Sequence, residues 1–194
     1  MVLPETSQVE VMNPDDLEIA FPGPQIMSAN AVLAREFNEY FYNEMAQSID
    51  FVKPLRVPDT LPRPAEDQRI AYSRKATLNF PGFTYAIPSR EFLRSHGVEA
   101  DVVLVVAGLK SSQGKTEIIS PKTGGSLQEK FLVLEGWYII WDYASGKPIA
   151  NGRFRPTREY RFKPETGDWM KSFELAVQKV MESSPFRGAK WYKR

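Results

Sequence analysis

The segment from Ala100 to Phe154 constrains the fold more than any other part of the sequence. It contains six consecutive apolar residues, Val102 to Ala107, and then a long apolar and aromatic run, Phe131 to Trp141. Continuous apolar runs of this kind are typical of strands that are covered on both sides. The polar, glycine-containing segment Asp142 to Lys147 predicts a turn that sends the chain back antiparallel. The segment therefore predicts a long aromatic hairpin within a buried sheet.

Side chains in the second run fall into two apolar sets, because successive residues of a strand point to opposite faces. One face would carry Phe131, Val133, Trp137, Ile139 and Trp141, and the other Leu132, Leu134, Tyr138 and Ile140. Both faces of this sheet must therefore be covered, either by helices or by another subunit. Trp141 and Trp169 are expected in the core together with Trp137.

Helical spacing marks two longer segments. Ser28 is a candidate N-cap for a helix reaching about Ser48, with an apolar stripe of Val32, Leu33, Phe37, Tyr40, Phe41 and Met45. Thr166 or Asp168 would cap a final helix that Pro185 ends, with an inward stripe of Met170, Phe173, Val177 and Val180. A shorter helix, Arg90 to His96, is expected to end at Gly97 in a left-handed conformation.

These elements predict an α/β (α+β) fold: a single domain over residues 26–186, with a mixed central sheet, helices on both faces and the long antiparallel aromatic hairpin. A chain of 194 residues with 42% hydrophobic residues can bury such a core without metals or disulfides. Residues 1–25 are predicted as an extended leader with one short strand at Leu17 to Phe21, because prolines interrupt this stretch. Residues 187–194 form a basic aromatic tail.

Charge and cysteine content exclude several classes of function. The chain has 25 basic and 24 acidic residues and a formal charge of +1, which disfavours a nucleic-acid partner. Cysteine is absent, which removes thiolate nucleophiles and thiolate metal sites. No apolar run is long enough to cross a bilayer. We expect no cofactor and no metal.

One motif resembles a phosphate-binding loop. Gly108 to Thr116 follows a buried strand and ends in Gly-Lys-Thr, but five residues separate the two glycines where the phosphate loop has four. The loop also requires a following helix whose N-terminus faces the phosphates, whereas Thr116 to Pro121 is typical of a strand and its end. A plain hairpin loop is the preferred interpretation.

Candidate catalytic residues are few, and the chain is more simply interpreted as non-catalytic. His96 is the single histidine, and its place beside Gly97 favours capping of the short helix. The carboxylate pairs Asp15-Asp16 and Glu66-Asp67 lie in polar segments. The proline-rich stretch Pro54 to Asp67 leaves one alternative open, in which it forms a site for a small molecule or glycan, or for carboxylate-dependent hydrolysis.

Four basic residues fall on alternating positions near the end of the sheet. Arg153, Arg155, Arg161 and Lys163 would share one strand face with Thr157 and Glu159, whereas Phe154, Tyr160 and Phe162 would share the other. This basic face is a candidate for docking an anionic partner, and so are Trp191 and Tyr192 in the basic tail. A solvated strand face is the competing interpretation.

The order of these elements along the chain also resembles that of a known protein family. The residues that carry this resemblance are the helix Ala29 to Gln47 with Asp50 to Leu55, the segments Gly97 to Leu104 and Phe131 to Trp141, Asp142 with Ser145-Gly146-Lys147, Ile149 to Gly152, and the helix from Trp169. This arrangement resembles the α/β domains of bacterial envelope lipoproteins related to the curli secretion-channel lipoprotein, the penicillin-binding-protein activator lipoproteins and the N-terminal domain of the Tol translocation protein.

The resemblance implies a periplasmic, outer-membrane-associated scaffold or adaptor that binds envelope proteins and often assembles into homo-oligomers. It implies no catalytic residues. Attachment to the membrane would require a lipid anchor, and the lipid-carrying cysteine is absent from this chain. A cytoplasmic location is the alternative if Met1 is the native start.

Overall fold

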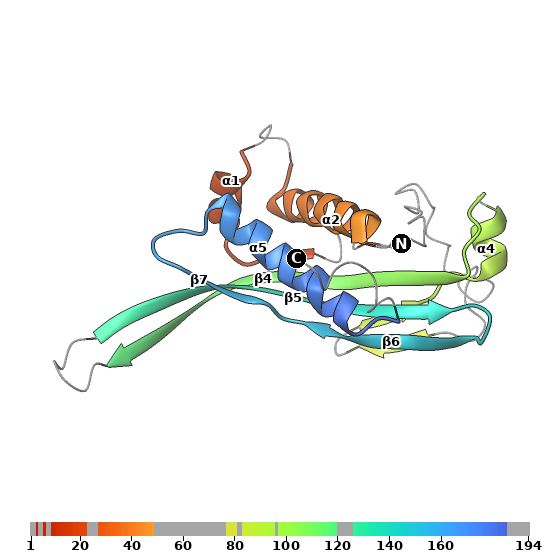
Figure 1. Cartoon of the computed structure of the whole chain (residues 1–194). Helices are drawn as coiled ribbons and strands as arrows, with labels where there is room; N and C mark the ends of the chain where they lie inside the picture. The colour runs from red at the N-terminus through yellow and green to blue at the C-terminus, as the bar shows by residue number, and fades with distance from the viewer. Residues whose placement is uncertain are drawn as a thin grey trace.

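The structure is a computed structural model that describes residues 3, 6, 9–22, 27–48, 77–80, 83–95, 97–119 and 126–185. Within these residues, the elements in chain order are β1 (Val9–Val11), α1 (Pro14–Ala20), α2 (Ala29–Ser48), β2 (Thr77–Phe80), β3 (Phe83–Ala86), α4 (Arg90–Ser95), β4 (Val102–Ile119), β5 (Ser126–Asp142), β6 (Lys147–Phe154), β7 (Thr157–Tyr160) and α5 (Thr166–Glu182) (Figure 1).

The main sheet has five strands and is mixed. Its order is β1-β4-β5-β6, and β7 pairs with the other end of β5 on the same side as β6. β1 runs parallel to β4, whereas β4, β5, β6 and β7 pair antiparallel. β2 and β3 form a separate two-stranded sheet. The mixed sheet and the α/β class that the sequence predicts are confirmed.

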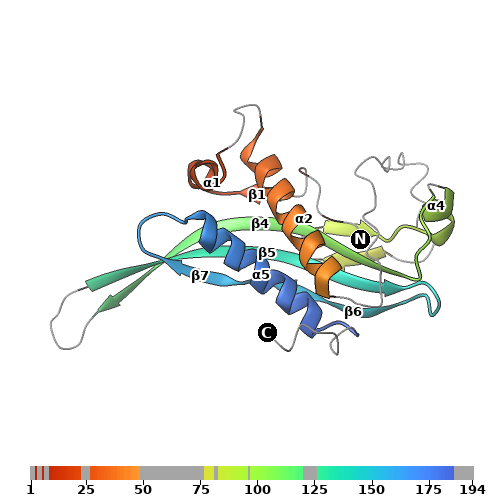
Figure 2. The same ribbon diagram turned by 45° about the horizontal axis from the view of Figure 1, so that its top comes forward.

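The two long helices lie side by side across one face of the sheet (Figure 2). Their apolar stripes meet the even-numbered side chains of β5, among them the buried Leu132, Leu134 and Ile140. Phe37 of α2 sits at the centre of this layer, because its ring centroid lies 6.0 Å from that of Phe154 on β6 and 5.6 Å from that of Phe173 on α5. Burial of these aromatic rings, together with the aliphatic side chains of the same cluster, stabilises this layer.

The opposite face carries a smaller apolar cluster, at the end of the sheet nearest the β5–β6 turn. Its members are Ile87, Val103, Val105, Ile139 and Trp141, with Tyr143 packed beside them. The Tyr143 hydroxyl donates to the Pro88 carbonyl, with 2.6 Å between the two oxygens. Both faces therefore carry buried apolar side chains, as the alternation predicts, although α2 and α5 share one face.

The N-terminal segment differs from the predicted leader. A helix, α1, occupies the place of the strand predicted at Leu17 to Phe21. Pro14 fits the first turn of a helix, where its missing N–H is not needed. The carboxylates of Asp15 and Asp16 in the same turn interact favourably with the positive end of the helix dipole. Leu17 is fully buried in the core cluster that also contains Val9 of β1. Val9, Leu17, Ala20 and Phe21 thus contribute to the same core cluster as the sheet and the long helices.

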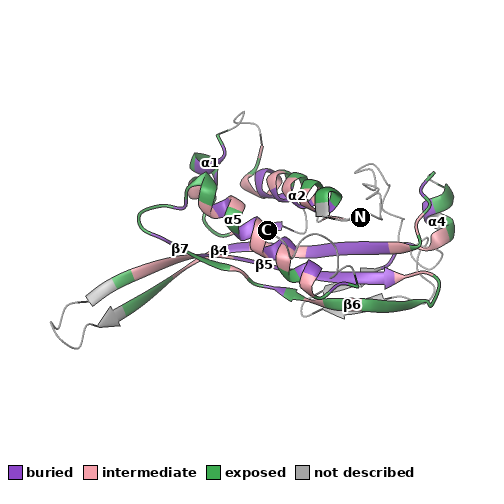
Figure 3. Cartoon of the chain, in the orientation of Figure 1, coloured by how far each residue is buried: buried purple, intermediate pink, exposed green. Residues whose placement is uncertain are grey.

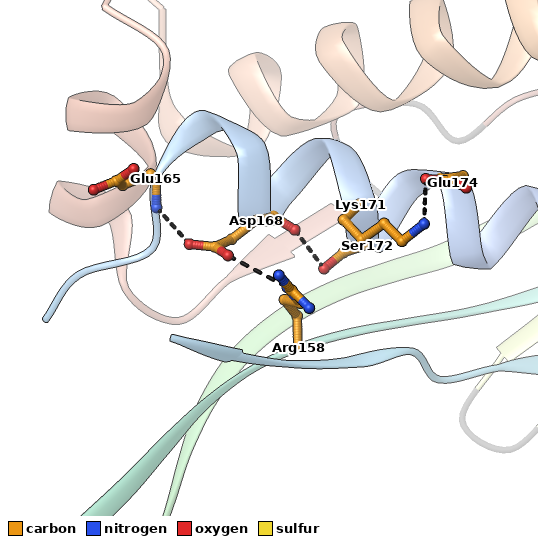
Figure 4. A network of polar contacts seen from close by, with 6 residues as sticks. All are labelled: Arg158, Glu165, Asp168, Lys171, Ser172 and Glu174. Carbon is orange, nitrogen blue, oxygen red and sulfur yellow. Dashed lines mark hydrogen bonds and ion pairs between the residues drawn. The ribbon is translucent and has the colours of Figure 1, made fainter. Parts of the chain in front are cut away.

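The helices otherwise follow the sequence closely. The Ser28 Oγ accepts the Ala31 N–H at 3.3 Å, which confirms the N-cap of α2. Gly97 has a φ of 73° just after α4, as predicted. The cap of α5 differs from both predicted candidates: Glu165 is the N-cap, and Asp168 three residues later accepts its backbone N–H in a capping box (Figure 4).

The predicted hairpin loop over Gly108 to Thr116 is wrong, because β4 runs through all of these residues. The register between β4 and β5 shifts between Ala107 and Lys110, which is a β-bulge, and Gly108 within it has a φ of 64°. Glycine at this position is explained by the left-handed backbone of a bulge. The described residues directly after Thr116 continue the strand, so the helix that a phosphate-binding loop requires does not begin there.

The far end of the β4–β5 hairpin extends past the rest of the sheet. β7 pairs with β5 only from Lys130 to Val133, so beyond Lys130 the described chain has two strands alone. Residues 116–119 and 126–129 form this two-stranded extension. Together with the Lys115–Lys130 pair at its base we call it the hairpin arm, and it stands clear of the helices in Figures 1 and 2. Lys115, Thr116 and Glu117 are exposed, and Figure 3 shows exposed residues on the described part of the arm.

Candidate functional site

The candidate site is the part of the sheet face opposite α2 and α5 that lies nearer the hairpin arm. Here the odd-numbered residues of β5 are half-buried, namely Phe131, Val133, Glu135 and Trp137. Beside them, Arg153 of β6 pairs with Trp137, and Thr157 of β7 pairs with Val133. We call this region, from Phe131 to Trp137 with its neighbours on β6 and β7, the open face.

Glu135 is the centre of a three-residue ion-pair cluster on the open face. One carboxylate oxygen, Oε2, pairs with Nη2 of Arg153 and lies 3.5 Å from Nε of Arg155. The Glu135 side chain is 25% exposed, whereas that of Arg155 is 61% exposed. Two guanidinium groups therefore share one carboxylate, and the cluster carries one surplus positive charge at its exposed end.

Arg153 is held from a second direction by an aromatic ring. Its guanidinium carbon lies 5.6 Å from the centroid of the Trp137 ring, within the range of a cation–π contact. A planar guanidinium that is fixed by both a carboxylate and an indole loses little additional rotamer freedom when another group binds to it. The pair therefore presents a preorganised cation beside an aromatic surface.

Such an arrangement is suited to recognition of a carboxylate. Guanidinium groups form short, charge-assisted hydrogen bonds with carboxylates, often in a two-pronged geometry. Trp and Arg are also the residue types that dominate the energetics of protein interfaces. The open face thus combines cationic and aromatic side chains that can bind a carboxylate group.

The four predicted basic residues do not form one strand face. Arg153 and Arg155 share Glu135, whereas Lys163 Nζ lies 3.6 Å from a carboxylate oxygen of Asp16 on α1. Arg161 is exposed in the bend after β7. The predicted alternation holds along β6 and β7, because both strands pair with β5 in the same register, and it fails after Tyr160, where β7 ends.

Phe162 also departs from its predicted place. The alternation assigns it to the inward face with Phe154 and Tyr160, but it is 85% exposed. The strand has already ended at Tyr160, so alternation no longer determines its direction. Trp191 and Tyr192 lie outside the described residues, and their role in partner binding stays a prediction.

Among the other sequence candidates, only the pair Asp15-Asp16 lies within the described residues. His96, the pair Glu66-Asp67 and the stretch Pro54 to Asp67 lie outside the described residues, so the ligand-binding and hydrolase alternative stays a prediction. The Asp16 carboxylate links α1 to β4, since it accepts a hydrogen bond from the Gln113 side-chain amide at 2.6 Å. No group of three or more acidic, histidine or cysteine side chains in the described part could hold a metal ion.

Glu135 and Trp137 are the site residues that the sequence pattern does not reveal. The pattern places Trp137 in the core with Trp141 and Trp169; the latter two are 8% and 1% exposed, but Trp137 is only half-buried. The one signal in the sequence is Glu135 itself, which shares a strand face with Val133 and Trp137. A carboxylate among apolar side chains requires a cationic neighbour. Identifying Arg153 and Arg155 as those neighbours requires the strand register.

Comparison of the sequence with protein-family models and with curated proteins finds no match in either. Among the described helices, none combines the length and apolar character needed to span a bilayer.

Proposed function

We propose that this protein is a non-catalytic scaffold or adaptor, and that its open face binds an acidic segment of a partner protein. The observation that carries the proposal is the exposed Arg153–Glu135–Arg155 cluster beside Trp137, on a sheet face that α2 and α5 leave uncovered. The cluster has one surplus positive charge, and Arg155 is its most exposed member. A carboxylate from a partner would balance that charge.

The expected affinity comes from both parts of the cluster. An exposed ion pair alone contributes only about 0–1 kcal/mol. Desolvation of an Arg–Trp pair at the centre of an interface contributes more, since truncation of such residues commonly reduces binding by about 2 kcal/mol or more, which corresponds to about thirtyfold or more in affinity. The half-buried Val133 and Phe131 extend the apolar part of the surface.

The cellular setting of the proposal rests on the family resemblance. We propose that the adaptor works in the bacterial cell envelope, on the periplasmic side of the outer membrane. Its partners would then be envelope proteins. Membrane attachment would depend on a lipid anchor, for which this sequence itself offers no cysteine.

Charge reversal on the open face tests this function. The tagged protein is recovered from its native host as wild type, as Arg155→Glu and as Lys171→Glu, and the co-purifying proteins are quantified by mass spectrometry. Lys171 is the matched control, because it is a comparably exposed cation on α5, which lies on the opposite side of the sheet. We expect Arg155→Glu to reduce recovery of a specific protein about tenfold and Lys171→Glu to leave it unchanged.

Arg155→Ala is the second variant, since it removes the cation without adding a carboxylate beside Glu135. It should weaken recovery in the same direction but less than Arg155→Glu. Equal recovery of the same proteins with all four chains would contradict the proposal, and so would the absence of any specific co-purifying protein.

A further inference from the structure

We infer that two copies of this chain associate by antiparallel pairing of β4 edges in their hairpin arms, with Thr116 of one copy opposite Thr116 of the other. The inference concerns a surface separate from the open face and does not depend on the proposed function. It would join the two arms into one four-stranded ribbon, with the order β5-β4-β4-β5.

The first observation is that the outer edge of β4 is open along the arm. β1 pairs with β4 only at Leu109, Lys110 and Ser111, and within the described residues no strand continues along that side. The sheet thus offers its unpaired N–H and C=O groups over residues 112–119. An open edge of this length is a template for another strand unless something blocks it, and this one contains no proline.

The direction of the backbone groups determines which residues would bond. The Ser111 carbonyl points outward, because it accepts the Met12 N–H at 3.2 Å. Backbone groups alternate in direction along a strand, and the β4–β5 register has no further shift after Lys110. The N–H and C=O groups of Gln113, Lys115 and Glu117 therefore face outward as well.

The second observation is the charge pattern of the arm. Within one hairpin, Lys115 lies directly opposite Lys130, and Glu117 lies opposite Gln128. Two lysines at facing positions of an antiparallel pair destabilise it. A carboxylate arriving on the other side of Lys115 would relieve this repulsion.

Pairing about Thr116 brings that carboxylate into place. Residues equally far from Thr116 on its two sides then face each other, so Lys115 of each copy lies opposite Glu117 of the other. Both are hydrogen-bonded positions by the alternation above, and their side chains share one face of the ribbon. Thr116 of one copy faces Thr116 of the other copy at a non-hydrogen-bonded position, where Thr–Thr pairs are favourable.

The base of the arm is held by polar contacts, which fixes its direction. The Tyr160 hydroxyl donates to the Gln113 side-chain oxygen at 2.7 Å, and the Gln113 amide donates to Asp16 of α1 at 2.6 Å. This chain of hydrogen bonds links β7, β4 and α1 at the point where the arm leaves the body. A strand edge that is already extended loses little conformational entropy on pairing.

The interface would be small, with about eight backbone hydrogen bonds and two ion-pair contacts if residues 113 to 119 all pair. Small, partly exposed interfaces are reversible and depend on protein concentration. The ion pairs are exposed, so added salt should weaken the association.

Because the chain has no cysteine, a single introduced thiol reports the geometry directly. Thr116→Cys should form an intermolecular disulfide under mild oxidation, since the two Cβ atoms at a non-hydrogen-bonded position are about 4.5–5.5 Å apart. Gln128→Cys is the matched control on β5, and in the proposed ribbon its two copies are separated by about 14 Å, three strand spacings. We expect a disulfide-linked dimer from the first variant and not from the second.

A charge swap gives the second measurement, by sedimentation velocity over a range of concentrations. Lys115→Glu and Glu117→Lys should each weaken self-association about tenfold, because each places like charges opposite each other twice. An equimolar mixture of the two variants should restore the dimer, since every facing pair is then opposite in sign. A wild-type chain that stays monomeric, equal cross-linking of both cysteine variants, or no recovery in the mixture would overturn the inference.

Discussion

Gly136 and Phe154 face each other in the β5–β6 pair, and the Phe154 ring occupies the space that a side chain at position 136 would need. A Cβ added to Gly136 would overlap Cζ of Phe154. Phe154 is fully buried and stacks against Phe37 of α2. The absence of a side chain on β5 thus lets the aromatic core close directly onto the sheet.

Gly136→Ala is expected to destabilise the fold by about 1–3 kcal/mol, because the Phe154 ring must move within a closely packed core. Urea denaturation of the wild type and the variant measures this change. Gly114→Ala is the matched control, since a Cβ there meets nothing within 4 Å, and its free energy of unfolding should stay within about 0.5 kcal/mol of the wild type. Similar losses at the two positions would show that backbone effects, and not the Phe154 ring, cause the destabilisation.

Phe37 should be the most sensitive single position of the helical layer. Its ring contacts those of Phe41, Phe154 and Phe173, and the residue is fully buried. Phe37→Ala is expected to reduce the free energy of unfolding by about 3–5 kcal/mol, through lost burial and the cavity left behind. The same substitution at the exposed Phe162 should change it by less than about 0.5 kcal/mol, and a loss at Phe162 comparable to that at Phe37 would contradict the assigned burial.

Asp168 connects the start of α5 to β7 (Figure 4). Its carboxylate accepts the Glu165 N–H at 3.0 Å and lies 3.4 Å from Nε of Arg158. Asp168→Ala should therefore reduce stability by about 1–2 kcal/mol, measured by chemical denaturation, because it removes a cap and an ion pair together. Lys171→Ala, which removes only an exposed contact to Glu174, should change stability by less than about 0.5 kcal/mol. Equal effects would show that the cap contributes nothing.

The raised pKa of the Tyr40 hydroxyl leads us to expect a loss of stability at high pH. Burial, with the nearby carboxylates of Glu44 and Glu174, raises the pKa of its hydroxyl from 10.0 to about 12. Between these values the unfolded chain releases the proton and the folded chain keeps it, so the free energy of unfolding falls as pH rises from about 10 to about 12. Tyr40→Phe should make that decline shallower, as measured by urea denaturation at several pH values. An unchanged slope would show that Tyr40 titrates alike in both states.

The sheet and the long helices were predictable because their apolar periods extend over most of each element. Alternation over Phe131 to Trp141 assigns the two faces of β5 correctly, and helical spacing places α2 within one or two residues of its ends. The local pattern failed where a single residue changes the backbone. Gly108 inserts a bulge and lets β4 continue, whereas the sequence pattern around it is typical of a loop.

The N-terminal segment and the open face required information that no local pattern contains. Prolines suggest an extended leader, but Pro14 sits where a helix tolerates it, and burial of Leu17 stabilises α1 against the sheet. Arg153 and Arg155 are recognisable as candidates from the sequence alone. Their convergence on Glu135 depends on the register of β5 with β6, which is a long-range property.

Photo-cross-linking in living cells of the native host tests most directly whether the open face is the working surface. A photoreactive amino acid replaces Arg155 in one strain and Lys171 in another, and the adducts formed on irradiation are compared by mass. Binding through the open face predicts a discrete adduct with another protein from position 155 and none of that mass from position 171. Adducts of equal yield at both positions, or none at position 155, would contradict the account.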